Sequence, residues 1–479
     1  MAQPDSTTSK PFRVIIVGAG IVGLSLSHAL QLANIDHVVL EKHDKIVSVR
    51  GAALIIWPPV ARIFDQFGIL DKIARTITPV GKEYIRWPDG SVSRYDPVQQ
   101  YMSKLFQVPS ILFDRQALVS HLYEGLPDKS YIHTNRRLER IEHTETGVCI
   151  HLADGSVEVG DMVIGADGVH SLVRQLMWDY ASEFEPGTIP ENEKEVMRFS
   201  EFRGIFGVST VKDSFNLGPA DTHVVLGQDN TKMVFTQHGK VYWGITFKDE
   251  AHLPEKRDKA TEADIEAVAK NFADHPITEK IKVGDLWGTN IRNGLLTVEE
   301  GVLGKWYAGR IVLVGDSVHK MTADIGMGAN IGIESAVYLC NILHREFGST
   351  PTRQITDNEL TSLFAEYQAG RHERASAFVH ASGQVTRMNS YQTYLGRFFV
   401  GYLAPYIVPL QRKATARTLA KAPKVDYAPT RTINESAEGW RLNEEREKEK
   451  EKEKEKNVDW AKYVFLTIML AASFTYLRP

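Results

Sequence analysis

Three glycines near the N-terminus have the spacing of a phosphate-binding turn. Gly18, Gly20 and Gly23 follow the β-branched run Val14–Val17, which predicts a buried parallel strand, and a helix is predicted over Leu24–Leu32. The first glycine permits the tight turn, the second lets the backbone approach a pyrophosphate, and the third lets the helix pack closely on the strand. Phosphates then meet free N–H groups and the positive end of the helix dipole.

Glu41 completes this pattern as a dinucleotide site. A second strand is predicted at Val38–Leu40, and Glu41 at its end stands 18 positions after Gly23. A carboxylate at this distance is placed to accept the hydroxyls of an adenosine ribose. Gly51 and Ala52 come next, and their small side chains let the chain pass close to a bound cofactor.

Two later turns place an aspartate directly after an apolar strand. Asp167 follows the predicted strand Val163–Ile164, and Asp316 follows the predicted strand Ile311–Val314. We interpret Asp167 as cofactor-associated because its turn repeats the strand–glycine–helix order. A carboxylate at Asp316 can meet hydroxyls of the same cofactor.

The turn after Asp316 extends through a glycine-rich stretch and opens another helix. Gly328, Ala329 and Asn330 precede a predicted helix over Ile331–Leu343. Glycines before a helix expose N–H groups and form a second anion site. The chain thus has three such turns, at residues 18–23, 165–168 and 315–330. Together they indicate one long cofactor that extends across a single domain.

Arg115 is a further candidate for contact with this cofactor. Asp114 is predicted to cap a helix that runs through Leu122, with Arg115 in its first turn. The helix dipole disfavours a cation there, so Arg115 indicates an anionic ligand or partner. The alternative is an ordinary surface arginine.

The composition is that of a globular protein of about three domains. The chain has 479 residues, of which 43% are hydrophobic and 24% charged, and its net charge of −4 gives no footprint for nucleic acid. Only Cys149 and Cys340 are present, which excludes a disulfide framework, argues against a metal site and fits a reducing compartment. The polar first ten residues lack a signal-peptide core, so a cytosolic start is expected.

These elements predict an α/β fold, α+β overall, built on a Rossmann-like nucleotide-binding domain. Residues 11–190 and 296–380 form that domain, and short apolar strands over 191–295 form an inserted antiparallel-sheet substrate domain. Residues 80–95 alternate around Asp89-Gly90 and predict a hairpin. A helical region is predicted over 381–440.

Within that last region, Tyr391–Gln411 is aromatic and apolar but interrupted by Pro405 and Pro409. An interfacial segment, a greasy lid and a helix packed on the body are the alternatives, and we favour the packed helix. Residues 420–440 are typical of a linker.

The C-terminus predicts a hydrophobic membrane helix behind a charged spacer. Residues 441–457 are rich in Glu and Lys, and Tyr463–Leu477 is an uncharged run of 15 residues. Counting from Val458, with Lys462 reaching to the interface, gives the roughly 20 residues that span a bilayer. We therefore predict an anchor over 458–477, the alternative being a terminal helix docked on the body. Six basic residues in the spacer stretch Glu444–Lys456, and then Lys462, precede the apolar run and only Arg478 follows it, which places the body on the cytosolic side, with the endoplasmic reticulum as the expected membrane.

Taken together, the turns resemble the FAD-dependent monooxygenases of the para-hydroxybenzoate hydroxylase class, over roughly residues 11–380. The stretches Gly315–Thr322 and Gly326–Asn330 are most similar to a fungal branch of that class. Enzymes of this branch epoxidise prenyl chains in meroterpenoid and indole-diterpene biosynthesis. Three positions depart from the pattern: Ala323 stands where the class usually has Pro, Ser335 where the branch usually has Asp, and Ile55 where the branch has a glycine.

The resemblance implies FAD as cofactor and NADPH or NADH as co-substrate. By this resemblance Glu41 binds the adenosine ribose, Arg115 the diphosphate or ribityl region, and Asp316 the ribityl–pyrophosphate. Amides near Ala329 face the flavin ring. Arg203, on a predicted strand of the substrate domain, is the candidate catalytic residue, holding an anion or a proton network over the ring, and an ordinary surface arginine is the equal alternative.

The activity that the resemblance implies is an epoxidation. The reduced flavin takes up O2 as a C4a-hydroperoxyflavin, which passes one oxygen to the prenyl chain of a lipophilic meroterpenoid intermediate. Aromatic hydroxylation of a phenolic polyketide is the alternative enzyme activity. A membrane-tethered flavoprotein for electron transfer is the alternative from another class, and the substrate domain argues against it. We also expect hand-over of the product to a membrane terpene cyclase.

Overall fold

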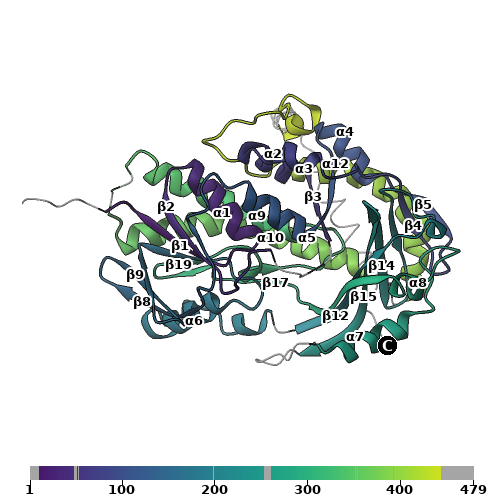
Figure 1. Cartoon of the computed structure of the whole chain (residues 1–479), viewed down its shortest axis with the longest axis horizontal. Helices are drawn as coiled ribbons and strands as arrows, with labels where there is room; N and C mark the ends of the chain where they lie inside the picture. The colour runs from purple at the N-terminus through teal and green to yellow at the C-terminus, as the bar shows by residue number, and fades with distance from the viewer. Residues whose placement is uncertain are drawn as a thin grey trace, which may run out of the picture.

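A six-stranded sheet carries the predicted nucleotide-binding turns, in the spatial order β18-β19-β11-β1-β2-β7 (Figure 1). All its pairs are parallel except β18 with β19. The four strands predicted from the apolar runs are its central strands, which confirms them, and Val14, Ile15 and Ile16 are fully buried because helices or strands cover both faces. The strands are β1 (Arg13–Val17), β2 (Asp36–Leu40), β7 (Ile132–His133), β11 (Met162–Gly165), β18 (Tyr307–Ala308) and β19 (Ile311–Leu313).

This computed structural model describes residues 10–47, 51, 53–197, 199–252, 260–350, 352, 354–391 and 393–443. Helices α1 (Ile21–Leu32) and α9 (Gly328–Phe347) cover one face of the six-stranded sheet, and α6 (Leu172–Phe184) lies on the other with a three-stranded meander (Figure 1). The meander consists of β8 (Leu138–Thr144), β9 (Gly147–Leu152) and β10 (Val157–Gly160).

A seven-stranded sheet forms the second layer system, in the order β16-β12-β15-β14-β13-β4-β5. The predicted antiparallel sheet is confirmed for most of it, and the predicted hairpin forms β4 and β5. That hairpin joins the sheet through a parallel pairing of β4 with β13, so the sheet is not confined to the predicted insertion. The strands are β4 (Glu83–Arg86), β5 (Val92–Tyr95), β12 (Phe199–Thr210), β13 (Thr222–Val225), β14 (Asn230–Gln237), β15 (Lys240–His252) and β16 (Asn290–Val298).

Two helices cover one face of the seven-stranded sheet. These helices are α7 (Glu262–Phe272) and α8 (Val283–Trp287). Ile205, Trp243 and Ile245 of the sheet form a buried cluster there with Ile265 of α7 and Leu286 of α8. The remaining elements before α9 are β3 (Ala53–Ile56), α2 (Pro58–Phe67), α3 (Leu70–Ala74), α4 (Val98–Phe106), β6 (Ile111–Asp114), α5 (Arg115–Glu124), η1 (Glu193–Glu195), η2 (Asp213–Phe215), β17 (Gly301–Val302), η3 (Gly315–Ser317) and β20 (His319–Lys320).

The long helix α10 (Asp357–Asn389) joins the two layer systems. A capping box fixes its start, with Thr356 N–H donating to Glu359 at 2.9 Å. The helix runs through the predicted domain boundary at 380. It is followed by α11 (Tyr394–Phe398), the π-turn η4 (Phe399–Leu403) and α12 (Ala404–Ala420), so the helical prediction holds as far as residue 420 and again from residue 438.

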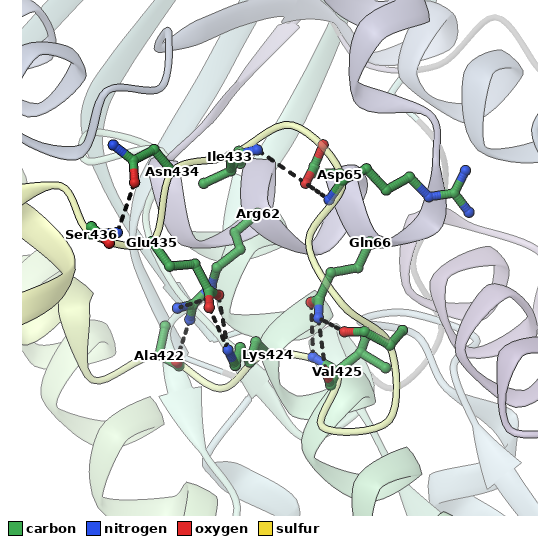
Figure 2. Close-up of polar contacts among 12 residues, drawn as sticks. Arg62, Asp65, Gln66, Ala422, Lys424, Val425, Ile433, Asn434, Glu435 and Ser436 are labelled. Carbon is green, nitrogen blue, oxygen red and sulfur yellow. Dashed lines mark hydrogen bonds and ion pairs between the residues drawn. The ribbon is translucent and has the colours of Figure 1, made fainter.

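Residues 421–436, here called the strap, are fastened to α2 (Figure 2). Gln66 donates to the Val425 carbonyl at 2.8 Å and accepts from its N–H at 3.0 Å, and Arg62 donates to the Ala422 carbonyl at 2.9 Å. Asp65 accepts from the N–H of Arg431 at 2.6 Å. The linker prediction for this stretch is therefore wrong, because buried side chains of α2 supply the hydrogen bonds that a linker takes from water.

The predicted anchor and the spacer beyond residue 443 lie outside the described residues. In the part of the chain that the structure describes, none of the helices combines the length and the apolar character needed to cross a bilayer.

Candidate functional site

A cavity of about 3130 Å³ lies between the two large sheets. The C-terminal ends of β1 and β2 and the turns after β11 and β19 line one end, which is the edge where parallel α/β sheets bind nucleotides. Strands of the seven-stranded sheet, α10 and the α11–α12 region line the other end. The predicted site residues that line the cavity are Gly18, Gly20, Glu41, Gly51, Arg115, Asp167, Asp316, Gly328 and Ala329.

The β1–α1 turn shows what each glycine does. A Cβ on Gly23 would lie 1.8 Å from the Gly18 carbonyl oxygen, and one on Gly18, whose φ is +105°, would lie 2.6 Å from the Ala166 carbonyl oxygen. A Cβ on Gly20 would meet no atom within 4 Å, because Gly20 faces the cavity. Helix α1 starts at this point without a side-chain cap, so its first N–H groups are available to an anion.

Glu41 stands at the end of β2 beside that turn. Its carboxylate accepts from the N–H of Ala19 and from the N–H of His43, each at 3.0 Å, and its side chain is only 13% exposed. Each carboxylate oxygen keeps acceptor capacity beyond one bond, so the fixed group can also take ribose hydroxyls. Ala52, the other predicted residue of this region, lies outside the described residues.

A charged cluster occupies the middle of the cavity. Lys320 donates to Asp316 at 2.7 Å, and the charge of Arg115 acts on both groups. Burial opposes the charged form of Asp316, but Lys320, His319 and Arg115 outweigh it and lower the pKa of this carboxyl. Arg115 opens α5 behind the Asp114 cap, as predicted, and Gly51 lies against its side chain. The cluster therefore presents both cations and an anion to a ligand with phosphates and hydroxyls.

The start of α9, predicted as a second anion site, also faces the cavity. The helix begins at Gly328 without a side-chain cap, and Gly328 and Ala329 line the cavity. Gly326 has a φ of +62°, and a Cβ there would lie 2.1 Å from Ile55. Close contact with β3 thus fixes the turn, and the N–H groups of α9 point to the cavity.

Asn330 does not contact the cavity, which corrects its assignment to the cofactor. The side chain is fully buried, donates to the carbonyls of Ile55 at 2.8 Å and Gly326 at 2.9 Å, and accepts from Trp57 N–H at 2.9 Å. Asn330 therefore holds the glycine turn against β3 and α2. The glycine-rich spacing predicted the turn but could not separate its lining residues from its supporting ones.

Asp167 lines the cavity, but its carboxylate points to α6. It accepts from Ser171 Oγ and from the N–H groups of Leu172 at 2.7 Å and Val173 at 3.1 Å. Burial raises its pKa and these bonds oppose the rise. The side chain thus caps a helix, and its association with a cofactor is confined to the position of its backbone beside Gly18.

Arg203 lies on the wrong face of the sheet for the role predicted for it. Side chains two apart on a strand share a face, and Ile205 belongs to the cluster under α7 and α8. Arg203 does not line the cavity and donates to Asp249 of the neighbouring strand at 3.1 Å. The prediction that it holds a group over the ring is corrected, because strand alternation alone did not reveal which face the helices cover.

Arg387 faces the cavity from α10. It donates to Glu201 at 2.7 Å and also pairs with Glu300, so it joins α10 to the seven-stranded sheet. Sequence reasoning missed it because α10 was not recognised as a cavity wall. The signal in the sequence was the helical spacing of three apolar residues of α10 that line the cavity. They are Phe378, Val385 and Met388, which are seven and three residues apart.

Asp324 is a second functional candidate that sequence reasoning missed. Thr386 Oγ1 donates to its Oδ2 at 2.6 Å, while its buried Oδ1 has no partner among the described residues. Thr322, Ser382 and Thr386 bond one another beside it and latch α10 to the turn before α9. Burial, opposed by the bond from Thr386, raises the pKa of Asp324 to about 6. The cavity thus contains a carboxyl able to donate or accept a proton.

The variant Asp324→Asn tests this raised pKa. A neutral Asp324 contributes stability that is complete below its unfolded pKa of about 4, declines as the pH rises and is lost above about 6. The wild type is therefore expected to lose about 2–3 kcal/mol relative to the variant between about pH 4 and pH 8. Denaturant unfolding at both pH values measures this, with exposed Asp71→Asn as control. Parallel pH profiles of wild type and Asp324→Asn would contradict it.

The residues at the nucleotide end fit FAD. Two uncapped helix starts, at α1 and α9, face one cavity, and the open space at Gly20 admits a pyrophosphate. Glu41 would hold the adenosine ribose, Arg115 and Asp316 the middle of the cofactor, and the N–H groups of α9 the flavin ring.

Comparison with known proteins defines the class. The FAD binding domain family matches residues 12–382. FAD-dependent monooxygenase ausM of Penicillium brasilianum is 35% identical over 438 residues, which cover 90% of this chain and 90% of that protein. FAD-dependent monooxygenase atmM of Aspergillus flavus is 32% identical over 433 residues, which cover 90% of this chain and 89% of that protein. The chain belongs to the FAD-dependent monooxygenases, which confirms the resemblance inferred from the sequence.

Solved structures share the fold. HpxO of Klebsiella pneumoniae, complexed with FAD and uric acid, has a TM-score of 0.65 at 19% identity, covering 87% of this chain and 100% of its own. CtdE in complex with FAD has a TM-score of 0.62 at 16% identity, covering 84% and 100%. The match of the fold with FAD-bound chains agrees with the geometry of the nucleotide end.

Proposed function

We propose that the protein uses NADPH or NADH and O2 to epoxidise the prenyl chain of a lipophilic, meroterpenoid-type intermediate. One oxygen atom of O2 enters the alkene, and the other leaves as water, which takes up the hydride that the nicotinamide gives to the flavin (two electrons and one proton) and one further proton from solvent. The observation that carries this proposal is the apolar end of the cavity, which suits a long hydrocarbon chain. That end is lined by Phe206, Met233, Phe235, Leu296, Phe378 and Val385.

The residues around the cofactor site have three tasks in this reaction. FAD held at the nucleotide end would supply the oxygen-activating chemistry. The N–H groups at the start of α9 would stabilise negative charge on the facing edge of the cofactor. The apolar walls from the sheet and α10 exclude water and hold the alkene in place, which is what an epoxidation requires of them, since no base is needed.

Aromatic hydroxylation of a phenolic polyketide is the second candidate. Asp324 favours it, because an unpartnered carboxyl oxygen at the cavity could take the phenol proton. An electron-transfer role is disfavoured by the size of the cavity, since electron carriers need little room for a substrate.

We also propose that residues 458–477 anchor the catalytic body to the cytosolic side of the endoplasmic reticulum, where the product passes to a membrane terpene cyclase. The apolar sequence of that segment and the basic residues before it support this part of the proposal.

The test uses purified full-length protein in detergent, incubated with NADPH or NADH and 18O2. A farnesylated phenol or aromatic acid is compared with the same compound without its prenyl chain. We expect flavin absorbance bands, nicotinamide oxidation, and one 18O atom in the product of the prenylated compound only. One 18O atom in the ring of the unprenylated compound would favour the hydroxylase instead, and protein that cannot be loaded with FAD would overturn both.

A further inference from the structure

A helical surface beside the cavity exposes large apolar side chains to solvent. Tyr394, Phe398, Tyr402, Tyr406 and Leu410 recur every fourth residue across α11, η4 and α12, and they are 91%, 51%, 63%, 78% and 78% exposed. Consecutive side chains at this spacing are neighbours on a helix surface, so the five form one continuous strip. We call this set the aromatic face. Contiguous exposed apolar patches of this kind usually mark an interaction site.

The opposite side of the same helices belongs to the body. Val400 is buried against Leu226 and Tyr391, and Phe399 and Ile407 line the cavity. Figure 1 shows α12 at the end of the molecule that carries β4 and β5. Phe398 and Leu410 of the aromatic face also line the cavity, so these helices form its rim and whatever covers the aromatic face borders the apolar end of the cavity.

The charge of the surrounding segment distinguishes between two possible partners of the aromatic face, a second copy of the chain and an anionic surface. From residue 390 to residue 425 the chain contains no acidic residue, and it contains six basic ones, in a protein of net charge −4. Of these, Arg397, Lys413 and Lys421 are exposed. A second copy docked face to face by two-fold symmetry would bring this basic segment against itself. An anionic surface instead gains attraction from each nearby Lys or Arg.

The kinds of side chain also fit a lipid surface. Tyrosines are enriched where a membrane meets water, because the ring is apolar and the hydroxyl can stay hydrated. A helix with an aromatic and leucine face and basic flanks is typical of one that lies in the plane of the interface.

We infer that the aromatic face lies in the headgroup region of a bilayer containing anionic lipids, so that the apolar end of the cavity abuts the membrane. This contact is separate from the predicted anchor at 458–477, and it fixes which side of the body faces the lipid. A lipophilic substrate dissolved in the bilayer then has a short path to the cavity.

Depth-dependent quenching on the full-length protein tests this contact. An environment-sensitive fluorophore is attached at Tyr406→Cys or Leu410→Cys in a Cys149→Ser background, since Cys340 is fully buried. The matched control is Val159→Cys, which is 57% exposed on the meander at the other end of the molecule (Figure 1). Vesicles contain phosphatidylcholine with or without phosphatidylserine, and either lipid carries a bromine or nitroxide quencher.

With phosphatidylserine present, we expect several-fold stronger quenching at 406 and 410 than at 159, and weaker quenching after Lys413→Glu or in high salt. Equal quenching at the three positions would overturn the inference, because the anchor alone would then explain the binding. Labels at 406 and 410 that are shielded without vesicles and cross-link between copies would also overturn it, in favour of a dimer. The readout requires no turnover, so failure of the proposed epoxidation would leave it unaffected.

Discussion

Gly23→Ala is expected to prevent formation of a stable FAD-bound protein, whereas Gly20→Ala is expected to fold normally and bind FAD weakly. A Cβ added at position 23 would lie 1.8 Å from the Gly18 carbonyl oxygen, between backbone segments that cannot separate without moving α1 off β1. We expect a loss of about 3–5 kcal/mol of unfolding free energy. At Gly20 the added methyl meets only open space in the protein, so its cost falls on the ligand, with FAD affinity reduced about tenfold or more.

Thermal unfolding and fluorescence titration with FAD separate the two effects. Gly288→Ala is the control, because its Cβ would make only an ordinary 3.4 Å contact outside the cavity. If Gly23→Ala retained the wild-type melting temperature and flavin content, the close approach of helix and strand would not be required. If Gly20→Ala bound FAD as tightly as the wild type, the pyrophosphate would not pass over this turn.

Glu334→Gln is expected to cost about 3–5 kcal/mol of unfolding free energy. Glu334 on α9 is fully buried and accepts from Arg371 at 3.1 Å and from Arg374 at 2.7 Å, both on α10. Removing its charge leaves Arg371, whose side chain is 2% exposed, without its anionic partner. The same two helices provide the control, since Glu366 pairs with Arg345 at 2.7 Å on the surface, and Glu366→Gln should cost about 0–1 kcal/mol.

At acidic pH, the difference in unfolding free energy between the wild type and Glu334→Gln should become smaller. Burial opposes ionisation of Glu334, but Arg374 and Arg371 outweigh it and lower its pKa. A carboxyl with a lowered pKa contributes stability that is present above the unfolded pKa and is lost as the pH falls through the folded one. Denaturant unfolding of the wild type and both variants, at neutral and at acidic pH, measures how much unfolding free energy each substitution removes. Equal losses for Glu334→Gln and Glu366→Gln would contradict the role of the buried network.

The sequence predicted the nucleotide end well because its signals are local. A β-branched run, a glycine turn and a following helix contact one another within a few residues, so Gly18, Glu41 and Asp316 were placed correctly beside the cavity. The misplacements concern contacts made over long sequence distances. The face on which the Arg203 side chain lies depends on helices more than 50 residues away in the sequence. The side chain of Asn330 is hydrogen-bonded to the Ile55 carbonyl of β3.

The strap is a second case in which contacts distant in the sequence decided the structure. Residues 421–436 have a polar composition that suits solvent, and only the buried Asp65 and Gln66 of α2, more than 350 residues earlier, convert them into a fixed segment. The cavity wall formed by α10 was overlooked because its apolar spacing is equally typical of a core helix. Pattern alone gives the period of a helix and not the identity of the surface that it covers.

The segment from residue 390 to 420 is fastened at both ends, by the hydroxyl latch on α10 and by the strap on α2. Neither fastening uses the residues that line the apolar end of the cavity in between. Within the segment, Ala416 and Leu419 belong to the main core, whereas Phe399, Leu403 and Ile407 line the cavity, so substitutions at these lining positions can change substrate fit without touching either fastening. For protein engineering, they are the positions to vary while the two junctions and the core positions are kept.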